Sequence, residues 1–154
     1  MNPNEPLRDP VVVLEHSVDA AVSAAFAWKF WTDVSNWDDP PARFFLEGPF
    51  AEGSVGTTVL PQQPPLRWCI RHVHSGRSAT IEMELEDATL AFQWHFDPAA
   101  EHRVRLTQRL VLSGDKAAAY VDQVRSGFAP NVSAGMVRLA GAMAAAERRD
   151  ANGG

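Results

Sequence analysis

Two histidines that are two residues apart, His72 and His74, are the first candidates for chemistry in this sequence. Residues i and i+2 of a β-strand point to the same side, so both imidazoles could bind one transition-metal ion if this segment is a strand. A cupin-like metal site would also need a glutamate ligand shortly after the second histidine, but Ser78 and Ala79 stand there instead. A third ligand could come only from His95 on a nearby strand. We therefore interpret the pair as surface histidines and expect no metal site.

Other signatures of catalysis are missing from the sequence. It has no His-Glu-x-x-His motif, no paired cysteines, no P-loop and no Gly-x-Gly-x-x-Gly, so we expect no cofactor. Cys69 alternates with Trp68 and Ile70, which predicts that its thiol points away from their side of a strand. We identify no catalytic residue. Three acidic residues alternate with apolar ones and are interpreted as a solvated strand face: Glu82, Glu84 and Glu86.

The composition indicates one acidic domain. The chain has 154 residues, 45% of them hydrophobic, which suits one domain with a core. Its net charge of -5 and its scattered basic residues argue against binding to nucleic acid. Without a signal peptide or a long apolar run, we expect a cytoplasmic protein, monomer or homodimer, with no stable membrane insertion. We expect residues 1–10 and 150–154 to be flexible and residues 11–149 to form the domain.

A long helix is predicted from Lys116 to Arg149, and it is the element that the rest of the domain must cover. Gly127 and Pro130 lie inside it, so we expect a bend there, with Phe128 at the entrance to any cavity. The apolar residues of the helix recur every three or four positions and predict one buried face: Val121, Val124, Phe128, Val132, Met136, Leu139 and Met143.

The remainder of the chain is predicted to form an antiparallel sheet. A strand at 11–18 is expected to end at Asp19, which could cap a helix from Ala20 to Trp31, and Asp33 could cap a further single turn. In the strand at 79–86, Thr80 is expected on the solvated face with the glutamates. The fold class is therefore α+β, with two short helices between the first strand and six more: 43–46, 54–60, 66–73, 79–86, 89–96 and 103–112.

Large apolar side chains gather on the predicted face of the sheet that turns towards the long helix. They could form a close-packed core, but a strongly curved sheet around one helix is hard to fill, so we favour a ligand cavity. Gln108 is a polar residue on this apolar face, where it must either bind a neighbour or face a ligand. The candidate ligand-binding residues are Trp37, Trp68, Ile70, Met83, Phe92, Trp94, Gln108, Phe128, Val132 and Met136.

Several local motifs resemble the SRPBCC (START-like) superfamily, and within it the polyketide cyclase/dehydrase and lipid-transport-like bacterial proteins. They are the run from Phe30 to Trp37, the glycines Gly53 and Gly56, Leu106-Thr107-Gln108, and the run from Asn131 to Met136. The resemblance implies a helix-grip fold, in which a curved seven-stranded antiparallel sheet grips the C-terminal helix around a hydrophobic pocket. The segment Asp38-Asp39-Pro40-Pro41 departs from these relatives, which often have another aromatic residue here, and this alters the expected pocket entrance.

The resemblance implies binding or transport of a small hydrophobic or aromatic ligand, lipid-like or polyketide-like, in an internal cavity. One alternative is a polyketide cyclase or aromatase that works without a metal, in which the pocket mainly positions a reactive chain. Another is a protein-interaction module like the chaperone activators of the superfamily. We favour ligand binding over catalysis because the predicted pocket contains no acid-base pair.

Overall fold

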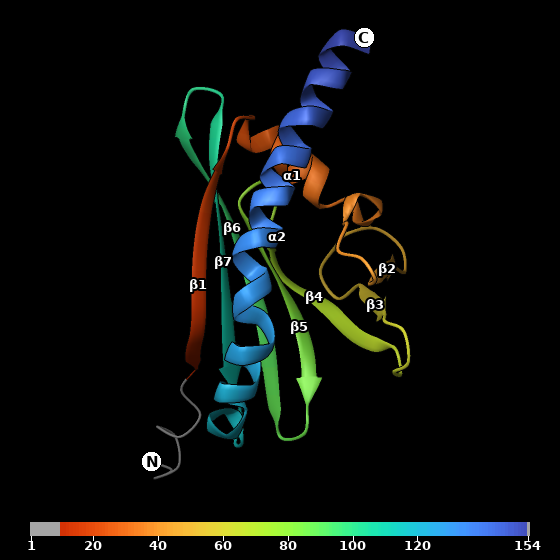
Figure 1. Ribbon diagram of the computed structural model, residues 1–154, viewed down its shortest axis with the longest axis vertical. Coiled ribbons are helices and arrows are strands. Elements are labelled where there is room, and N and C mark those ends of the chain that lie inside the picture. Colours follow the sequence, from red (N-terminus) through yellow and green to blue (C-terminus); the bar gives the residue numbers. More distant parts are fainter. Residues whose placement is uncertain (1–9, 154) are drawn as a thin grey trace.

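The computed structural model describes residues 10–153; residues 1–9 of the expected flexible N-terminus and residue 154 lie outside the described residues. The chain forms seven strands, two α-helices and one 3-10 turn (Figure 1). In chain order the elements are β1 (Val11–Ala20), α1 (Ala24–Trp31), η2 (Val34–Asn36), β2 (Arg43–Leu46), β3 (Val55–Val59), β4 (Leu66–His74), β5 (Ser78–Leu85), β6 (Ala88–Ala100), β7 (Arg103–Ser113) and α2 (Ala117–Gly153).

The seven strands form one antiparallel sheet in the order β1-β7-β6-β5-β4-β3-β2. The first strand, β1, pairs with the last, β7, so β1 forms one edge of the sheet and β2 forms the other. Helix α2 lies across one face of the sheet and packs chiefly against β1 and β7 (Figure 1). The predicted α+β class, with a seven-stranded antiparallel sheet and a long C-terminal helix, is confirmed. Within residues 10–153, neither helix has a stretch apolar enough to span a membrane.

The start of α1 differs from the prediction. Asp19 was expected to cap this helix, but it lies within β1 opposite Arg105 of β7, and its carboxylate accepts a hydrogen bond from Arg105 Nε at 3.0 Å. The helix begins later, where Ser23 Oγ accepts from the backbone N–H of Phe26 at 3.1 Å. A long-range partner therefore extends the strand through Asp19. The predicted cap of the next turn is confirmed, since Asp33 Oδ1 accepts from the N–H of Ser35 at 3.1 Å.

Two elements extend beyond their predicted ends. Strand β6 continues from Phe96 to Ala100, where it pairs with the start of β7. Helix α2 runs through Gly127 and Pro130 without interruption and ends at Gly153, so Asp150 to Asn152 are helical.

Polar contacts near both ends of α2 hold it on the sheet. Near its start, the Tyr120 hydroxyl donates to the Glu86 carbonyl oxygen at 3.0 Å. In its second half, Arg138 Nη2 lies 3.1 Å from Asp39 Oδ1 in the loop before β2, and Glu147 contacts His102 in the β6–β7 turn. Helix α2 covers the concave face of the sheet. These contacts fix it to the β5–β6 turn, to the loop before β2 and to the β6–β7 turn.

The concave face carries two hydrophobic clusters. Phe92 of β6 and Val132 of α2 pack against both, so they mark the boundary between the clusters. The first cluster lies around α1 and has as buried members Ala20, Val22, Ala27, Trp31, Val34, Trp68, Ile70, Ala79, Ile81, Trp94, Phe96, Val104, Leu106, Met136 and Met143. The second lies near the start of α2, with Val13, Leu90, Leu110, Leu112, Ala117 and Val124.

Aromatic rings fill the first cluster closely. Trp31 of α1 lies at its centre, with its ring centroid 5.2 Å from those of both Trp94 and Phe96. Trp37 stacks on Trp68 with centroids 5.4 Å apart. Such contacts add to the free energy gained from burying the rings, so this end of the concave face is a well-packed core.

Candidate ligand-binding site

The site is built around Gln108, at the centre of β7. Gln108 faces Trp94 of β6 on one side and His16 of β1 on the other in the strand register. Directly opposed residues of antiparallel strands point to the same face, with Cβ atoms roughly 4.5–5.5 Å apart. Leu106 and Leu110, which alternate with Gln108, are fully buried in the core clusters. Trp94, Gln108 and His16 therefore form one row on the concave face.

The amide of Gln108 has no protein partner in the part of the chain that the structure describes. The residue is 9% exposed, and its side chain makes no hydrogen bond within residues 10–153. Among these residues, no side-chain nitrogen or oxygen is both fully enclosed and without a hydrogen bond. Space must therefore reach the Gln108 amide from outside the packed core. Of the two roles predicted for Gln108, contact with a neighbour or with a ligand, the first is not observed within residues 10–153.

His16 belongs to the same row and is not among the residues predicted from the sequence to bind a ligand. Its imidazole is half-buried and, like Gln108, makes no side-chain hydrogen bond within the described residues. Leu14, His16 and Val18 face Leu110, Gln108 and Leu106 in register, which places all three on the concave face. The alternation of Leu14, His16 and Val18 was the available signal for this placement.

The concave face has few other polar groups and no charged ones on its strands. In residues 10–153, the strand positions that share this face with Gln108 carry no Lys, Arg, Asp or Glu. The third polar strand residue on this face, Thr58 of β3, is already engaged, because its Oγ1 accepts from Trp68 Nε1 at 3.0 Å. Gln108, His16 and the indole N–H of Trp94 are thus the polar groups on this face of the strands that make no side-chain hydrogen bond within the described residues.

The other predicted ligand-binding residues divide into two groups by burial. Trp68, Ile70, Trp94 and Met136 are buried in the first core cluster. Five are half-buried: Trp37, Met83, Phe92, Phe128 and Val132.

Phe92, Phe128 and Val132 come together at the boundary between the clusters. The rings of Phe92 and Phe128 meet edge to face with centroids 5.4 Å apart, and Val132 is one helical turn beyond Phe128 on α2. Phe92 is also next to Trp94 in the inward alternation of β6, so these apolar side chains lie beside the Gln108 row. Trp37 is further away, among the rings of the first cluster, where its Nε1 donates to the Trp31 carbonyl oxygen at 2.7 Å.

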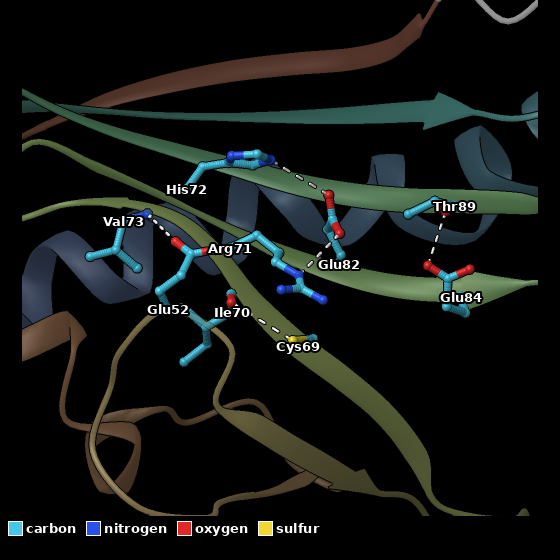
Figure 2. A network of polar contacts seen from close by, with 9 residues as sticks. All are labelled: Glu52, Cys69, Ile70, Arg71, His72, Val73, Glu82, Glu84 and Thr89. Atoms are coloured by element: carbon cyan, nitrogen blue, oxygen red, sulfur yellow. Dashed lines mark hydrogen bonds and ion pairs between the residues drawn. The ribbon is translucent and has the colours of Figure 1, made fainter.

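The histidines that first suggested a metal site lie outside the concave face. The β4–β5 register shifts between Arg71 and His74, and His72 has a positive φ of 53° within this irregular segment. His72 Nε2 lies 3.9 Å from Glu82 Oε2, and Arg71 Nε lies 3.9 Å from Glu82 Oε1. Figure 2 shows this network on the side of the sheet turned away from the helices.

His74 has different surroundings from His72. It lines a surface depression of about 310 Å³ with Arg77, Ser78, His95 and Asp97. Across residues 10–153, no three His, Cys, Asp or Glu side chains are close enough together to hold a metal ion.

The convex face of the sheet is mostly polar, with one correction to the predicted alternation. Thr80 was expected to be solvated, but it is only 7% exposed; it lies on a central strand between Arg71 and Gln93, whose long side chains are able to shield it. Cys69 lies opposite Glu82 on this face, as its alternation predicted. At the β1 edge, the hydrogen bond from Arg105 holds the pKa of Asp19 below its usual value.

Comparison with known proteins identifies the fold. No protein-family model matches the chain. No curated protein is significantly similar to it in sequence. Solved structures, in contrast, match over most of its length. Norcoclaurine synthase from Thalictrum flavum superimposes with a TM-score of 0.65 at 14% identity, over 94% of this chain and 90% of that one.

Two bacterial structures give similar matches. The Zhui aromatase/cyclase from Streptomyces sp. R1128 has a TM-score of 0.61 at 19% identity and covers 92% of this chain and 96% of its own. A protein from Thermus thermophilus, TTHA0849, has a TM-score of 0.63 at 11% identity, covering 90% of this chain and 99% of its own. The chain therefore shares the helix-grip fold of these structures, in which a seven-stranded antiparallel sheet packs against a long C-terminal helix. At these identities the likeness shows the fold alone.

Proposed function

We propose that this protein binds a small, mostly apolar ligand between the concave face of the sheet and α2. The observation that carries the proposal is the unpartnered amide of Gln108 on an otherwise apolar face. Space reaches this amide, so solvent can pair with it in the unliganded protein. A ligand that displaces the solvent must offer the amide a hydrogen-bonding group, because leaving the amide unpaired costs about 1–3 kcal/mol.

The apolar side chains beside Gln108 supply the rest of the proposed contact. Phe92, Phe128 and Val132 are half-buried, so part of their apolar surface still faces water. Covering such surface contributes about 25 cal/mol for each Å² removed from water. The indole of Trp94 lies next to Gln108 in register and adds an aromatic ring to this row.

The chemistry of this face favours lipid-like or aromatic ligands over charged metabolites. A buried ligand charge needs a partner, and the described strand positions of the concave face carry no charged side chain. One structure of norcoclaurine synthase was solved with dopamine and hydroxybenzaldehyde. This relative of low identity supports small aromatic molecules as the first ligands to test.

Native mass spectrometry with a panel of fatty acids, flavonoids and polyketide-like aromatics tests the proposal. We expect at least one class to bind with one molecule per chain and to raise the melting temperature. Phe128→Ala should weaken this binding, because it removes apolar surface beside Gln108. Phe45→Ala is the matched control, since Phe45 lies on β2 at the far edge of the sheet and is 48% exposed. Failure of the whole panel to bind would reject the proposal.

A second candidate function is that of a metal-free cyclase or aromatase, and His16 is the observation that favours it. An imidazole has two ring nitrogens that can donate and accept hydrogen bonds, and it is the side chain most often used to transfer protons within a pocket. His16 lies on the concave face beside Gln108, where a bound polyketide-like chain would pass. Turnover of a poly-β-keto model compound that is lost in His16→Leu would support this function. Equal product distributions with and without protein would reject it.

A further inference from the structure

We infer that Gln108 and His16 together form a hydroxyl-binding subsite, which selects uncharged ligands that carry a hydroxyl group at one end of an apolar body. This inference rests on the proposed function, and it adds the chemical group that the site recognises. The two residues face each other directly across β1 and β7 on the concave face.

The hydrogen-bonding capacity of the pair fits a hydroxyl group. The Gln108 amide offers two N–H donors and a carbonyl acceptor, and a neutral imidazole offers one donor and one acceptor. A ligand hydroxyl accepts from one of these side chains and donates to the other, so one group can engage both. An ether or a carbonyl can only accept, and an apolar ligand would leave the Gln108 amide unpaired.

The surroundings of the pair argue against an ionised group. Burying a carboxylate or an ammonium away from water requires an opposite charge or several hydrogen bonds. The basic residues nearest in register, Arg105 and Arg109, lie on the convex face of β7, where they pair with Asp19 and Glu15. The inward side of helix α2 in this region is apolar and is formed by Val124, Phe128 and Val132.

Internal hydrogen bonding does not account for the pair. Trp68 Nε1 and Thr58 Oγ1 satisfy each other on the same face at 3.0 Å, and Trp37 Nε1 donates to a backbone oxygen at 2.7 Å. The side chains of Gln108 and His16 make no hydrogen bond within residues 10–153, although Gln108 is 9% exposed. The indole N–H groups of Trp37 and Trp68 are thus paired within the protein. The side chains of Gln108 and His16 remain able to form hydrogen bonds with a ligand.

Three probes of similar shape test the inference: 2-naphthol, naphthalene and 2-naphthoate. We expect the wild-type protein to bind 2-naphthol about tenfold more tightly than naphthalene, as one net hydrogen bond of about 1.4 kcal/mol predicts. Gln108→Leu should abolish this difference, because 2-naphthol loses its partner and naphthalene no longer leaves an amide unpaired. Gln93→Leu is the matched control, because Gln93 lies on the convex face opposite Arg109, and this variant should keep the tenfold preference.

The outcomes separate the inference from the proposed function. Equal affinities for 2-naphthol and naphthalene, or a preference that persists in Gln108→Leu, overturn the hydroxyl subsite but leave apolar binding in place. Tighter binding of 2-naphthoate also overturns it, in favour of an anion site. If neither 2-naphthol nor naphthalene binds, the hydroxyl subsite is overturned, and the wider ligand panel decides the proposed function. Should Gln108→Leu not fold, the side-chain amide resonances of Gln108 in the wild type decide: 2-naphthol should move them further downfield than naphthalene, which acts on them through its ring current alone, and equal shifts overturn the hydroxyl subsite.

Discussion

The indole of Trp68 occupies the space in which Gly56 would carry a side chain: a Cβ at residue 56 would lie 2.1 Å from the nearest ring carbon. The two residues face each other across β3 and β4 on the concave face. The ring therefore packs against bare backbone on one side, and it stacks on Trp37 with centroids 5.4 Å apart. A glycine in the middle of a strand thus allows an aromatic ring to lie in the core.

Gly56→Ala should destabilise the protein. The added methyl group forces the Trp68 ring to move within a packed core, at a cost of about 1–3 kcal/mol. Chemical denaturation measures the free energy of unfolding. Gly127→Ala is the control, because its Cβ would meet nothing within 4 Å on α2, and it should stabilise the helix by up to about 1 kcal/mol. Equal stabilities of the two variants would show that Trp68 is not packed as described.

Thr58→Val should destabilise the protein by about 1–3 kcal/mol, because it leaves the buried Trp68 Nε1–H without its acceptor. Thr58→Ser keeps the hydroxyl and should recover most of the loss. Thr57→Val, which alters the neighbouring position on the opposite face of β3, should stay within about 0.5 kcal/mol of the wild type. Thermal denaturation followed by tryptophan fluorescence compares the three variants. A Thr58→Val protein as stable as the wild type would contradict the Nε1 hydrogen bond.

The Asp19–Arg105 pair predicts a small pH dependence of stability. The pKa of Asp19 is lower in the folded protein than in the unfolded chain, so the pair stabilises the fold above the unfolded pKa and loses this effect as pH falls through the folded pKa. The difference in stability between the wild type and Asp19→Asn should therefore be largest near neutral pH and shrink below about pH 4. Both side chains are exposed, so added salt should reduce the difference. A difference that grows on acidification would contradict the pairing.

The sequence predicted most elements because the strands are separated by turn residues and the long helix has a regular apolar period. The predictions were wrong where contacts between residues far apart in the sequence determine the local structure. The extension of β1 through Asp19 depends on Arg105, which lies far along the chain. The register shift after Arg71, with His72 at positive φ, has no local signature in the sequence.

The two residues of the central row illustrate the same limit at the site. Gln108 was identified because Leu106 and Leu110 on either side fix its alternation. His16 was missed because the register of β1 shifts between Val12 and Leu14, so an alternation counted from Val11 places His16 on the wrong face. How much space remains around this row depends on the packing of α2 against β1 and β7, which no local pattern encodes.

The central claim is that a ligand binds on the concave face beside Gln108. Titration of ¹⁵N-labelled protein with 2-naphthol, followed by chemical-shift mapping, tests it most directly. We predict saturable shifts of the Gln108 side-chain amide and the Trp94 indole N–H, together with the backbone amides of Phe92 and Val132. Shifts confined to convex-face residues such as Glu82 and Gln93, or no saturable shifts at all, would contradict the account.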